Sequence, residues 1–515
     1  MSPTPLDGRG YPADLGGGVV LRAPGLLGEA TLEDGLLGGT RGETENATQA
    51  LREAMDEAGF RQLQAVSVRA QELPAPPAGG DVRSADNGEP GMVLTVPGVG
   101  GSFGQVLMLV DEQGVITWHF PDADVGPAGL ADRTSFTVSR RVATRPQDRV
   151  EGPAGTPDAG SEETGTRGVV SVIGTKLLSV LVFPLVEKGL AKVADHLAKP
   201  LEEATHPYGI RMMTPTGFRV KAADPLDGTG WDRLGRGRAL LLLHGTASSS
   251  HSAFAGLGES FAPLHAAYGG RVFAFDHHTL SDDLGANIER LLQLLPPDRR
   301  LEVDIVSHSR GGLVARALSD RMRSDGAPLD VRRIVYVATP NNGTPLADPA
   351  RIREFLNRVT TMLNLIPDGP WSVVTDTLSG ILTAVRVVGS GAVGGLSGLA
   401  TMRPDGDVLG GLGWLEGEGE EQYAVDVDFE PTGRILQLVR GVDGVVDTVF
   451  ESEANDIVVP TGGVASIVGQ QGFRIPREHR LSLGTTNAAW HCSLFSQPQV
   501  GAQLQAWLTA GASDG

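Results

Sequence analysis

The stretch LEVDIVSHSRGGLVARAL, residues Leu301–Leu318, decides the fold of this chain. Val303–Val306 is β-branched apart from one aspartate and follows a polar turn, which predicts a short buried strand. Gly311–Leu318 has apolar residues one turn apart on one face, which predicts a helix. Ser309 lies between the two, on a sharp turn from strand to helix, with small residues two positions away on either side.

This turn follows the nucleophile-elbow pattern G-x-S-x-G, with Ser307 in place of the first glycine and Gly311 as the second. Small residues are needed because the turn is strained and brings strand and helix close together. The hydroxyl of Ser309 is then held clear of the sheet, near the positive end of the helix. Taken alone, S-x-S-x-G is also compatible with a serine-rich turn of purely structural role, so the interpretation depends on the rest of the chain.

The composition narrows the classes of protein that this chain can belong to. Its 515 residues are enough for two to four domains, and a hydrophobic content of 40% allows a large core. The formal net charge of −19 argues against nucleic acid as a partner and leaves only weak contact with a membrane surface open. Cys492 is the single cysteine, so no intrachain disulfide forms. The N-terminal sequence lacks a secretory signal, and we expect a cytoplasmic location.

The first 238 residues are expected to fold apart from the last domain and to comprise several segments. Residues 1–44 are Gly-rich and expected to be loose, residues 45–142 predict a small α+β module, and residues 143–168 read as a polar linker. The module is expected to hold one helix and about four strands: Asn46–Gln64, then Met92–Val96, Gln105–Val110, Val115–Phe120 and Ser135–Val142. It contains no catalytic constellation, and its role and any protein partner remain open.

Residues 169–238 are interpreted as a bridging helix and the approach to the last domain. Val169–Leu197 is apolar to amphipathic, but its longest uncharged run, Leu177–Val186, is shorter than the ~20 residues that a membrane span requires. Pro184 interrupts it as well. We therefore expect a buried or domain-bridging helix, with an interfacial membrane helix as the alternative.

From Ala239 to the end at residue 515, strands and helices alternate. Ala239–Leu243 is continuously apolar, which is typical of a strand buried on both faces of a parallel sheet. The alternation predicts one doubly wound, mostly parallel sheet with right-handed crossovers. The further expected elements are Ser250–Leu264, Arg271–Phe275, Leu284–Leu295, Arg333–Val337, Tyr423–Phe429, Arg434–Val446, Leu481–Leu483 and Val500–Leu508. Functional groups are expected at the carboxyl ends of these strands.

Residues 346–421 interrupt this alternation. Arg351–Leu365 predicts a helix, and Trp371–Leu399 is apolar and glycine-rich. We interpret the segment as an inserted lid; additional core is the alternative.

A serine hydroxyl is a poor nucleophile unless a base takes its proton and a carboxylate fixes that base. Two histidines follow Ser309 in the chain, His479 and His491. His491 lies just before the closing helix and is preferred, because His479 stands among charged residues typical of a surface. Asp456 is the preferred acid, since a turn-forming Asn-Asp pair followed by an apolar run places it on a loop. The rival acids are Glu451, Glu453 and Asp447.

Together these motifs resemble the α/β-hydrolase superfamily and, within it, the lipase and esterase group. The resemblance covers about residues 239–511 and keeps the family's order of nucleophile, acid and histidine. It rests on His244-Gly245, Ser307–Gly311, Ala338–Leu346, Asn455–Pro460 and His491–Phe495. Two features depart from the pattern. Ser307 replaces a glycine, and Asp456 lies beyond a further predicted helix rather than directly after the strand at 423–429.

The resemblance implies a role for each group. Ser309 would attack the acyl carbonyl, His491 would act as general base and then general acid, and Asp456 would orient it. The backbone N–H groups of Thr246 and Arg310 would form the oxyanion hole. The candidates for substrate binding are His244, Gly245, His308, His277 and His278, with His244 expected to support its loop rather than react. No metal-ligand spacing occurs, and no cofactor is expected.

The sequence thus predicts a serine hydrolase of carboxylic esters that works through an acyl-enzyme. The apolar insertion suggests a lipid-like or otherwise apolar acyl group on a small-molecule or lipid ester. The alternatives are a non-catalytic binding or signalling scaffold, or a thioesterase or amidase with the same groups. The natural substrate, the oligomeric state and the mobility of the lid do not follow from the sequence.

Overall fold

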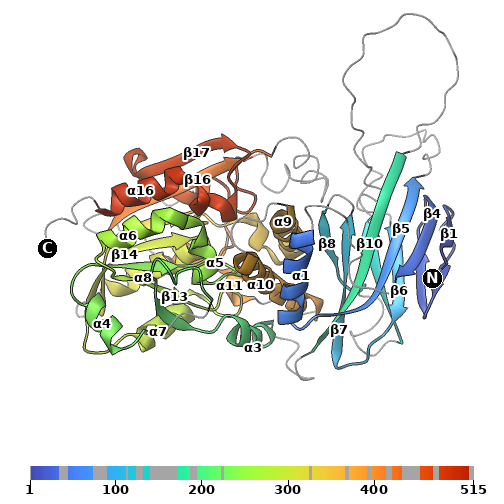
Figure 1. Ribbon diagram of the computed structural model, residues 1–515, viewed down its shortest axis with the longest axis horizontal. Coiled ribbons are helices and arrows are strands. Elements are labelled where there is room, and N and C mark those ends of the chain that lie inside the picture. The colour runs from blue at the N-terminus through green and yellow to red at the C-terminus, as the bar shows by residue number, and fades with distance from the viewer. Residues whose placement is uncertain are drawn as a thin grey trace, which may run out of the picture. The chain divides into compact units, whose positions relative to one another are not determined.

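The structure is a computed structural model in which the chain forms two compact units (Figure 1). It describes residues 2–33, 45–72, 90–111, 114–122, 132–139, 171–185, 194–221, 226–323, 327–365, 371–390, 396–412, 420–431, 453–467 and 475–509. One unit comprises Met1–Thr44, Arg61–Leu185 and Arg440–Gly444; the other comprises Glu45–Phe60, Val186–Val439 and Val445–Gly515. The expected linker at 143–168 and the expected helix Arg434–Val446 lie outside the described residues.

The first unit is built from two antiparallel sheets. One has the strand order β1-β4-β5-β10-β7-β8 and the other β2-β3-β6-β9. Alternate apolar residues of both sheets, including Leu6, Val66 and Leu178 of one and Met92 and Phe136 of the other, meet in one buried cluster. The strands are β1 Thr4–Asp7, β2 Ala13–Gly16, β3 Val19–Arg22, β4 Leu26–Glu33, β5 Arg61–Glu72, β6 Pro90–Pro97, β7 Phe103–Asp111, β8 Ile116–His119, β9 Arg133–Ser139 and β10 Ser171–Pro184.

Three expectations for this part of the chain differ from the structure. Residues 1–44, expected to be loose, contain four strands within residues 4–33. The helix expected over Val169–Leu197 is replaced at Ser171–Pro184 by β10, which pairs with both β5 and β7. Its run of β-branched and aromatic residues suits a strand between two neighbours, and apolar content alone does not distinguish such a strand from a buried helix.

The third difference concerns the helix expected over Asn46–Gln64. The helix α1, Glu45–Glu57, is followed by Gly59 in a left-handed conformation (φ +74°), and β5 starts at Arg61. The helix belongs to the second unit, where it packs against helices α9 (Ile352–Leu365) and α10 (Trp371–Gly389), and not to the strands around it in sequence. The expected module at 45–142 is therefore divided between the two units.

The second unit is organised around a seven-stranded sheet with the order β11-β13-β12-β14-β15-β16-β17. Its neighbours are paired in parallel except for β11, which is antiparallel to β13. This confirms the predicted doubly wound, mostly parallel sheet of an α/β-hydrolase-like fold. The strands are β11 Gly209–Met212, β12 Ala239–Leu243, β13 Val272–Asp276, β14 Leu301–His308, β15 Leu329–Val337, β16 Glu421–Phe429 and β17 Arg480–Thr486.

Helices cover this sheet. Leu240 and Leu242 of β12 share a buried core with Phe261 of α6 and Leu504 of α16. The helix α8 lies against β14 and β15 and also packs against α7. The helices are α3 Ala194–Thr205, α4 Gly228–Leu234, α5 Ser250–Phe254, α6 Phe261–Ala267, α7 Leu284–Leu294, α8 Arg310–Met322, α15 Gly462–Ala465 and α16 Pro498–Thr509. Three short 3-10 helices complete this set: η2 Ala255–Ser260, η5 Arg477–His479 and η6 His491–Ser496.

The described residues between Pro345 and β16 are mostly helical. It forms η3 Pro345–Ala347, η4 Pro349–Arg351, α9 Ile352–Leu365, α10 Trp371–Gly389, α11 Ser397–Ala400 and α12 Asp407–Gly411. The helix α10 contacts α1, α3, α5 and α9 and buries apolar residues such as Leu378 and Leu382. Among the helices that the structure describes, none has both the length and the apolarity needed to cross a membrane.

Candidate active site

Ser309 lies on the turn between β14 and α8 in a strained conformation, with φ 52° and ψ −130°. Its backbone N–H donates to the carbonyl of Val337 at 2.9 Å, which ties the turn to the end of β15. The serine that replaces the expected first glycine is accommodated, because Ser307 is buried and its hydroxyl donates to the carbonyl of Val335 at 2.9 Å. The strain at a single polar residue is typical of a functional turn.

Gly311 is required by the closeness of this turn to β12. A Cβ at this position would lie 2.3 Å from the carbonyl oxygen of Leu243 and 2.5 Å from that of His244. Both neighbours are backbone atoms of a central strand end, so they cannot move aside as a flexible side chain would. The glycine therefore lets α8 approach the sheet closely enough to form the elbow.

Gly311→Ala is expected to lower the free energy of unfolding by about 1–3 kcal/mol, the range typical of overpacking. Urea unfolding followed by circular dichroism measures this. The matched control is Gly410→Ala in α12, where an added Cβ meets nothing within 4 Å and stability should not fall. Equal stability of the two variants would contradict the close contact between α8 and β12.

His491 and Asp456 form a buried pair at the start of η6. The Nδ1 of His491 lies 2.8 Å from Oδ2 of Asp456, and its backbone N–H donates to the Asp456 carbonyl at 3.2 Å. The other carboxylate oxygen, Oδ1, accepts from the backbone N–H groups of Val458 at 3.0 Å and Val459 at 2.7 Å. Because an ionised carboxylate only accepts, the proton of the neutral imidazole lies on Nδ1 and its Nε2 is left as an acceptor.

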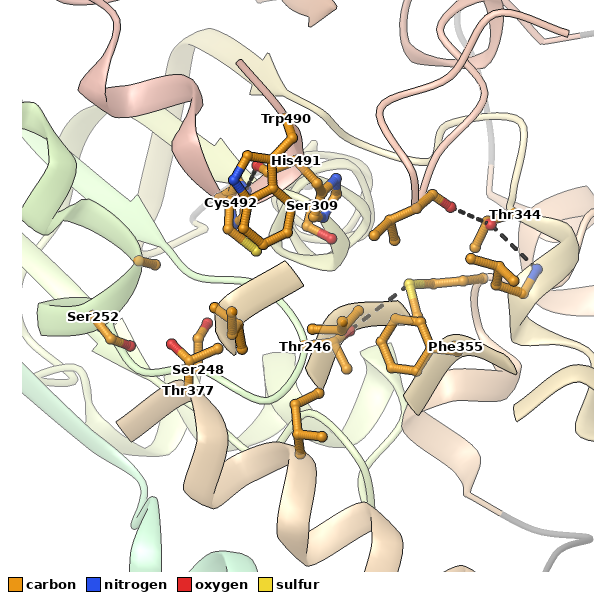
Figure 2. A pocket seen from close by; sticks show the side chains of 18 of the residues that line it. Thr246, Ser248, Ser252, Ser309, Thr344, Phe355, Thr377, Trp490, His491 and Cys492 are labelled. Atoms are coloured by element: carbon orange, nitrogen blue, oxygen red, sulfur yellow. Dashed lines mark hydrogen bonds between the residues drawn. The ribbon is translucent and has the colours of Figure 1, made fainter. Parts of the chain in front are cut away.

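Ser309 and His491 line one pocket of about 80 Å³ (Figure 2). Figure 2 shows the two side chains on the same wall of the pocket, next to Trp490. The insertion supplies much of the remaining lining, and most of its contribution is apolar. These lining residues are Leu346, Ala347, Phe355, Val359, Leu363, Val374, Thr377, Ile381, Leu399 and Met402.

The rival residues do not join this group. His479 lies in η5, where its Nδ1 is 3.1 Å from the carbonyl of Gln422 and its ring packs on Tyr423. It does not line the pocket. Glu453 has its carboxylate near Gly462 rather than at His491. The other two acids considered, Glu451 and Asp447, lie outside the described residues.

The loop after β12 passes close to Ser309. A Cβ on Gly245 would lie 2.8 Å from the Cβ of Ser309, so this position also requires a glycine. Thr246 lines the pocket, and Ala247 takes a left-handed conformation (φ 54°) while its N–H donates to Thr279 Oγ1 at 3.0 Å. Arg310 is the first residue of α8, where backbone N–H groups have no acceptor within the helix. Thr246 thus lines the same pocket as Ser309 from the loop after β12, and Arg310 follows Ser309 directly at the start of α8.

The side chain of Arg310 has a structural role that was not predicted from the sequence. Its guanidinium is buried and donates to the carbonyls of Gly398 at 2.9 Å and Asp282 at 2.7 Å and to Oδ1 of Asn287 at 3.0 Å. Burial lowers its pKa to about 10, which leaves it charged at neutral pH. The residue after the serine thus ties the elbow to the insertion at α11.

The four candidate histidines differ in position. His244 is buried, donates from Nδ1 to the Gly245 carbonyl and accepts at Nε2 from the N–H of His277, both at 3.0 Å. Burial lowers its pKa, which keeps it neutral, and its ring stacks on His277 at 4.1 Å. It supports the loop rather than facing the pocket. His277 and His278 are buried and do not line this pocket, whereas His308 does.

His308 contacts the loop that carries His491. Its Nε2 donates to the His491 carbonyl at 3.0 Å, and the two rings lie 5.0 Å apart. Burial, with the nearby His491, lowers the pKa of His308 to about 3, so this ring is neutral. Within the described residues, no group of histidine, cysteine or acidic side chains is arranged to hold a metal ion.

The chain is similar to several solved structures over a little more than half of its length. No curated protein matches this sequence. Similar solved structures include the lipase BlEst2 of Bacillus licheniformis in its mature form (15% identity, 56% of this chain and 95% of that chain, TM-score 0.31). They also include lipase 1 from Pelosinus fermentans (13%, 53% and 97%, TM-score 0.34) and a thermophilic esterase from Thermogutta terrifontis (15%, 54% and 92%, TM-score 0.30).

A family model covers the region that holds the sheet, the insertion and the pocket. It is described as a domain of unknown function, DUF7379, and matches residues 205–509. That match spans more than half of the chain and contains Ser309, Asp456 and His491. This chain belongs to the DUF7379 family.

Proposed function

We propose that this chain is a serine hydrolase that cleaves carboxylic esters with an apolar acyl group through an acyl-enzyme. The observation that carries the proposal is the buried pair of His491 and Asp456 on the same pocket as the strained Ser309. With Nδ1 bonded to Asp456, the neutral imidazole keeps Nε2 as its acceptor, and both His491 and Ser309 line the pocket. A strained serine beside a histidine that is oriented by a carboxylate has the parts needed for nucleophilic catalysis.

The reaction follows from these groups. Nε2 of His491 takes the hydroxyl proton as Oγ of Ser309 attacks the ester carbonyl, and Asp456 stabilises the imidazolium. The backbone N–H groups of Thr246 and Arg310 stabilise the negative charge on the carbonyl oxygen. His491 then gives its proton to the departing alcohol. Water, activated by the same imidazole, releases the carboxylic acid and restores the serine.

The lining of the pocket supports an apolar acyl group. Phe355, Val359 and Leu363 of α9 face the pocket together with Val374 and Ile381 of α10. An uncharged hydrocarbon chain gains about 0.8 kcal/mol for each buried methylene on such a wall. The cavity of about 80 Å³ is small beside the roughly 300–1,000 Å³ that holds a drug-sized ligand, which favours short to medium acyl chains.

We expect kcat/KM for p-nitrophenyl esters to rise from acetyl to medium acyl chains by about fourfold per methylene and then to level off, as the methylene contribution implies. Val359→Phe should fill the pocket and lower kcat/KM for octanoyl relative to acetyl esters by about tenfold. The control is Val408→Phe, at an exposed site in α12, which should keep the wild-type profile. A strict preference for acetyl esters in the wild type would refute the apolar acyl group.

Labelling by a fluorophosphonate probe tests the proposed chemistry without assuming a substrate. The probe reacts with an activated serine, and peptide mass spectrometry then identifies the modified residue. The expected result is one label, on Ser309, that disappears when the protein is denatured first. A folded protein that neither takes the label nor hydrolyses any ester of the series would overturn the proposed function.

A further inference from the structure

The helix α10 carries a buried carboxylate that reaches the loop after β12. Oδ2 of Asp376, whose side chain is 1% exposed, accepts from the hydroxyl of Ser249 at 2.7 Å. Oδ1 lies 3.5 Å from Nε2 of His206, 3.6 Å from Nζ of Lys221 and 3.8 Å from Nε2 of His251. A buried charge is tolerated only when it is paired in this way, so Asp376 fixes the position of α10 in the second unit.

One turn further along the same helix, the backbone of α10 meets the same loop. A Cβ on Gly380 would lie 2.4 Å from the carbonyl oxygen of Ala247. Residues four apart share a helix face, so Asp376 and Gly380 present one surface to residues 245–249. An adjacent surface of α10, with Val374, Thr377 and Ile381, lines the pocket.

The loop that α10 touches is the one that requires support. Ala247 has a positive φ, a strained conformation that persists only where the surrounding structure holds it in place. Thr279 fixes its N–H from one side, and α10 packs on its carbonyl from the other. The amide of Thr246, directly before this strained residue, is the proposed donor to the oxyanion. A small displacement of the loop would therefore move that donor.

The insertion is also anchored at a second point. Arg310, whose own amide is the other proposed oxyanion donor, binds the carbonyl of Gly398 and lies 3.3 Å from the Thr401 hydroxyl. Both donors are thus connected to the insertion, one through α10 and one through α11. A swing of this part of the insertion away from the pocket would break the contacts at both.

We propose that Asp376 and Gly380 are positioning residues that hold loop 245–249 in its productive geometry, so that α10 is a fixed wall of the active site during turnover and not a lid that swings away. This inference rests on the proposed function, because it assigns Thr246 to the oxyanion. It changes the interpretation of residues 346–421: the part around α10 completes the catalytic groups as well as covering them.

The test compares Asp376→Asn, Gly380→Ala and Ser249→Ala with the wild type in kcat and KM for p-nitrophenyl butyrate. Asp407→Asn and Gly410→Ala are the controls, at an exposed site and an open site of α12 in the same insertion. We expect the three test variants to lower kcat by about 10–100-fold and to keep KM within about threefold of the wild-type value. Loss of a complete oxyanion-hole donor typically costs more, ~10²–10³-fold. The controls should behave as the wild type.

The pair Ser249→Ala and Asp376→Asn also provides a double-mutant cycle. If the two side chains act through their hydrogen bond, the double variant should lose no more kcat than the more affected single variant. Ser249→Ala leaves the carboxylate with His206, Lys221 and His251, so it tests the loop even if Asp376→Asn does not fold. A purely structural role of Asp376 would lower thermal stability while leaving kcat of the folded enzyme unchanged.

The outcomes separate this inference from the proposed function. An active wild type, labelled at Ser309, with variants that keep kcat within about threefold would overturn the positioning role and leave the hydrolase assignment standing. A wild type that is neither labelled nor active would remove both. A loss confined to kcat in all three variants, absent from the α12 controls, supports α10 as part of the catalytic structure.

Discussion

Ser309→Ala is expected to lower kcat/KM for p-nitrophenyl butyrate by about 10³-fold or more while the protein stays folded. The substitution removes the attacking oxygen and leaves the base, its acid and the proposed oxyanion donors in place. Alanine fits the site, because the strained backbone is already set by contacts of the main chain, including the bond from residue 309 N–H to the Val337 carbonyl. Initial rates and the midpoint of thermal unfolding, measured on the same preparation, check both parts.

The control for this variant is Ser319→Ala. Ser319 is also buried and lies on α8, but it does not line the pocket. The Ser319→Ala variant should retain the wild-type rate, and the fluorophosphonate probe should still label it at Ser309. Ester hydrolysis by Ser309→Ala at more than a few per cent of the wild-type rate would place the nucleophile elsewhere and would make the strained turn a structural feature only.

The elbow could be predicted from the sequence because its signal is local. A strand, a serine and a helix follow one another within Leu301–Leu318, so the pattern of the turn is complete in one short stretch. The alternation of apolar strands and helices after Ala239 could likewise be recognised locally, since the central strand β12 is apolar throughout and buried on both faces. Those two signals were enough to predict the mostly parallel sheet.

The support of the site could not be predicted, because it depends on contacts between distant residues. Asp376 reaches Ser249 across 127 residues, and Arg310 reaches Gly398 across 88. The sequence signal for the first contact was a single acidic residue within the mostly apolar helix Trp371–Gly389. A buried acid in such a helix requires partners, but the sequence does not say which ones.

In the first part of the chain, sequence-based prediction failed for a different reason. Ser171–Pro184 is apolar enough for a buried helix or a strand, and only its two neighbouring strands decide between them. Likewise α1 lies between two strands of the first unit in sequence but packs on α9 and α10 of the second. Membership of a unit follows from long-range packing, so sequence order alone assigned this helix to the wrong part of the molecule.

Asp456→Asn is expected to lower kcat by roughly 10³–10⁴-fold with little change in fold, because it would trap the wrong tautomer of His491. Oδ1 of Asp456 accepts from two backbone N–H groups, Val458 and Val459, which only an oxygen can satisfy. The asparagine must therefore turn its oxygen to these amides and its NH₂ to Nδ1 of His491. The imidazole would then carry its proton on Nε2 and could no longer accept the proton of Ser309.

Asp426→Asn is the matched control for this prediction. Asp426 is a buried acid in β16, and burial raises its pKa. No contact joins Asp426 to His491 in the described part of the chain. The Asp426→Asn enzyme should therefore keep kcat within about threefold of the wild-type value. A large loss in Asp426→Asn together with a small one in Asp456→Asn would move the acid to β16. The reverse result, with a normal fold in both variants, would assign the orienting carboxylate to the loop at 453–467.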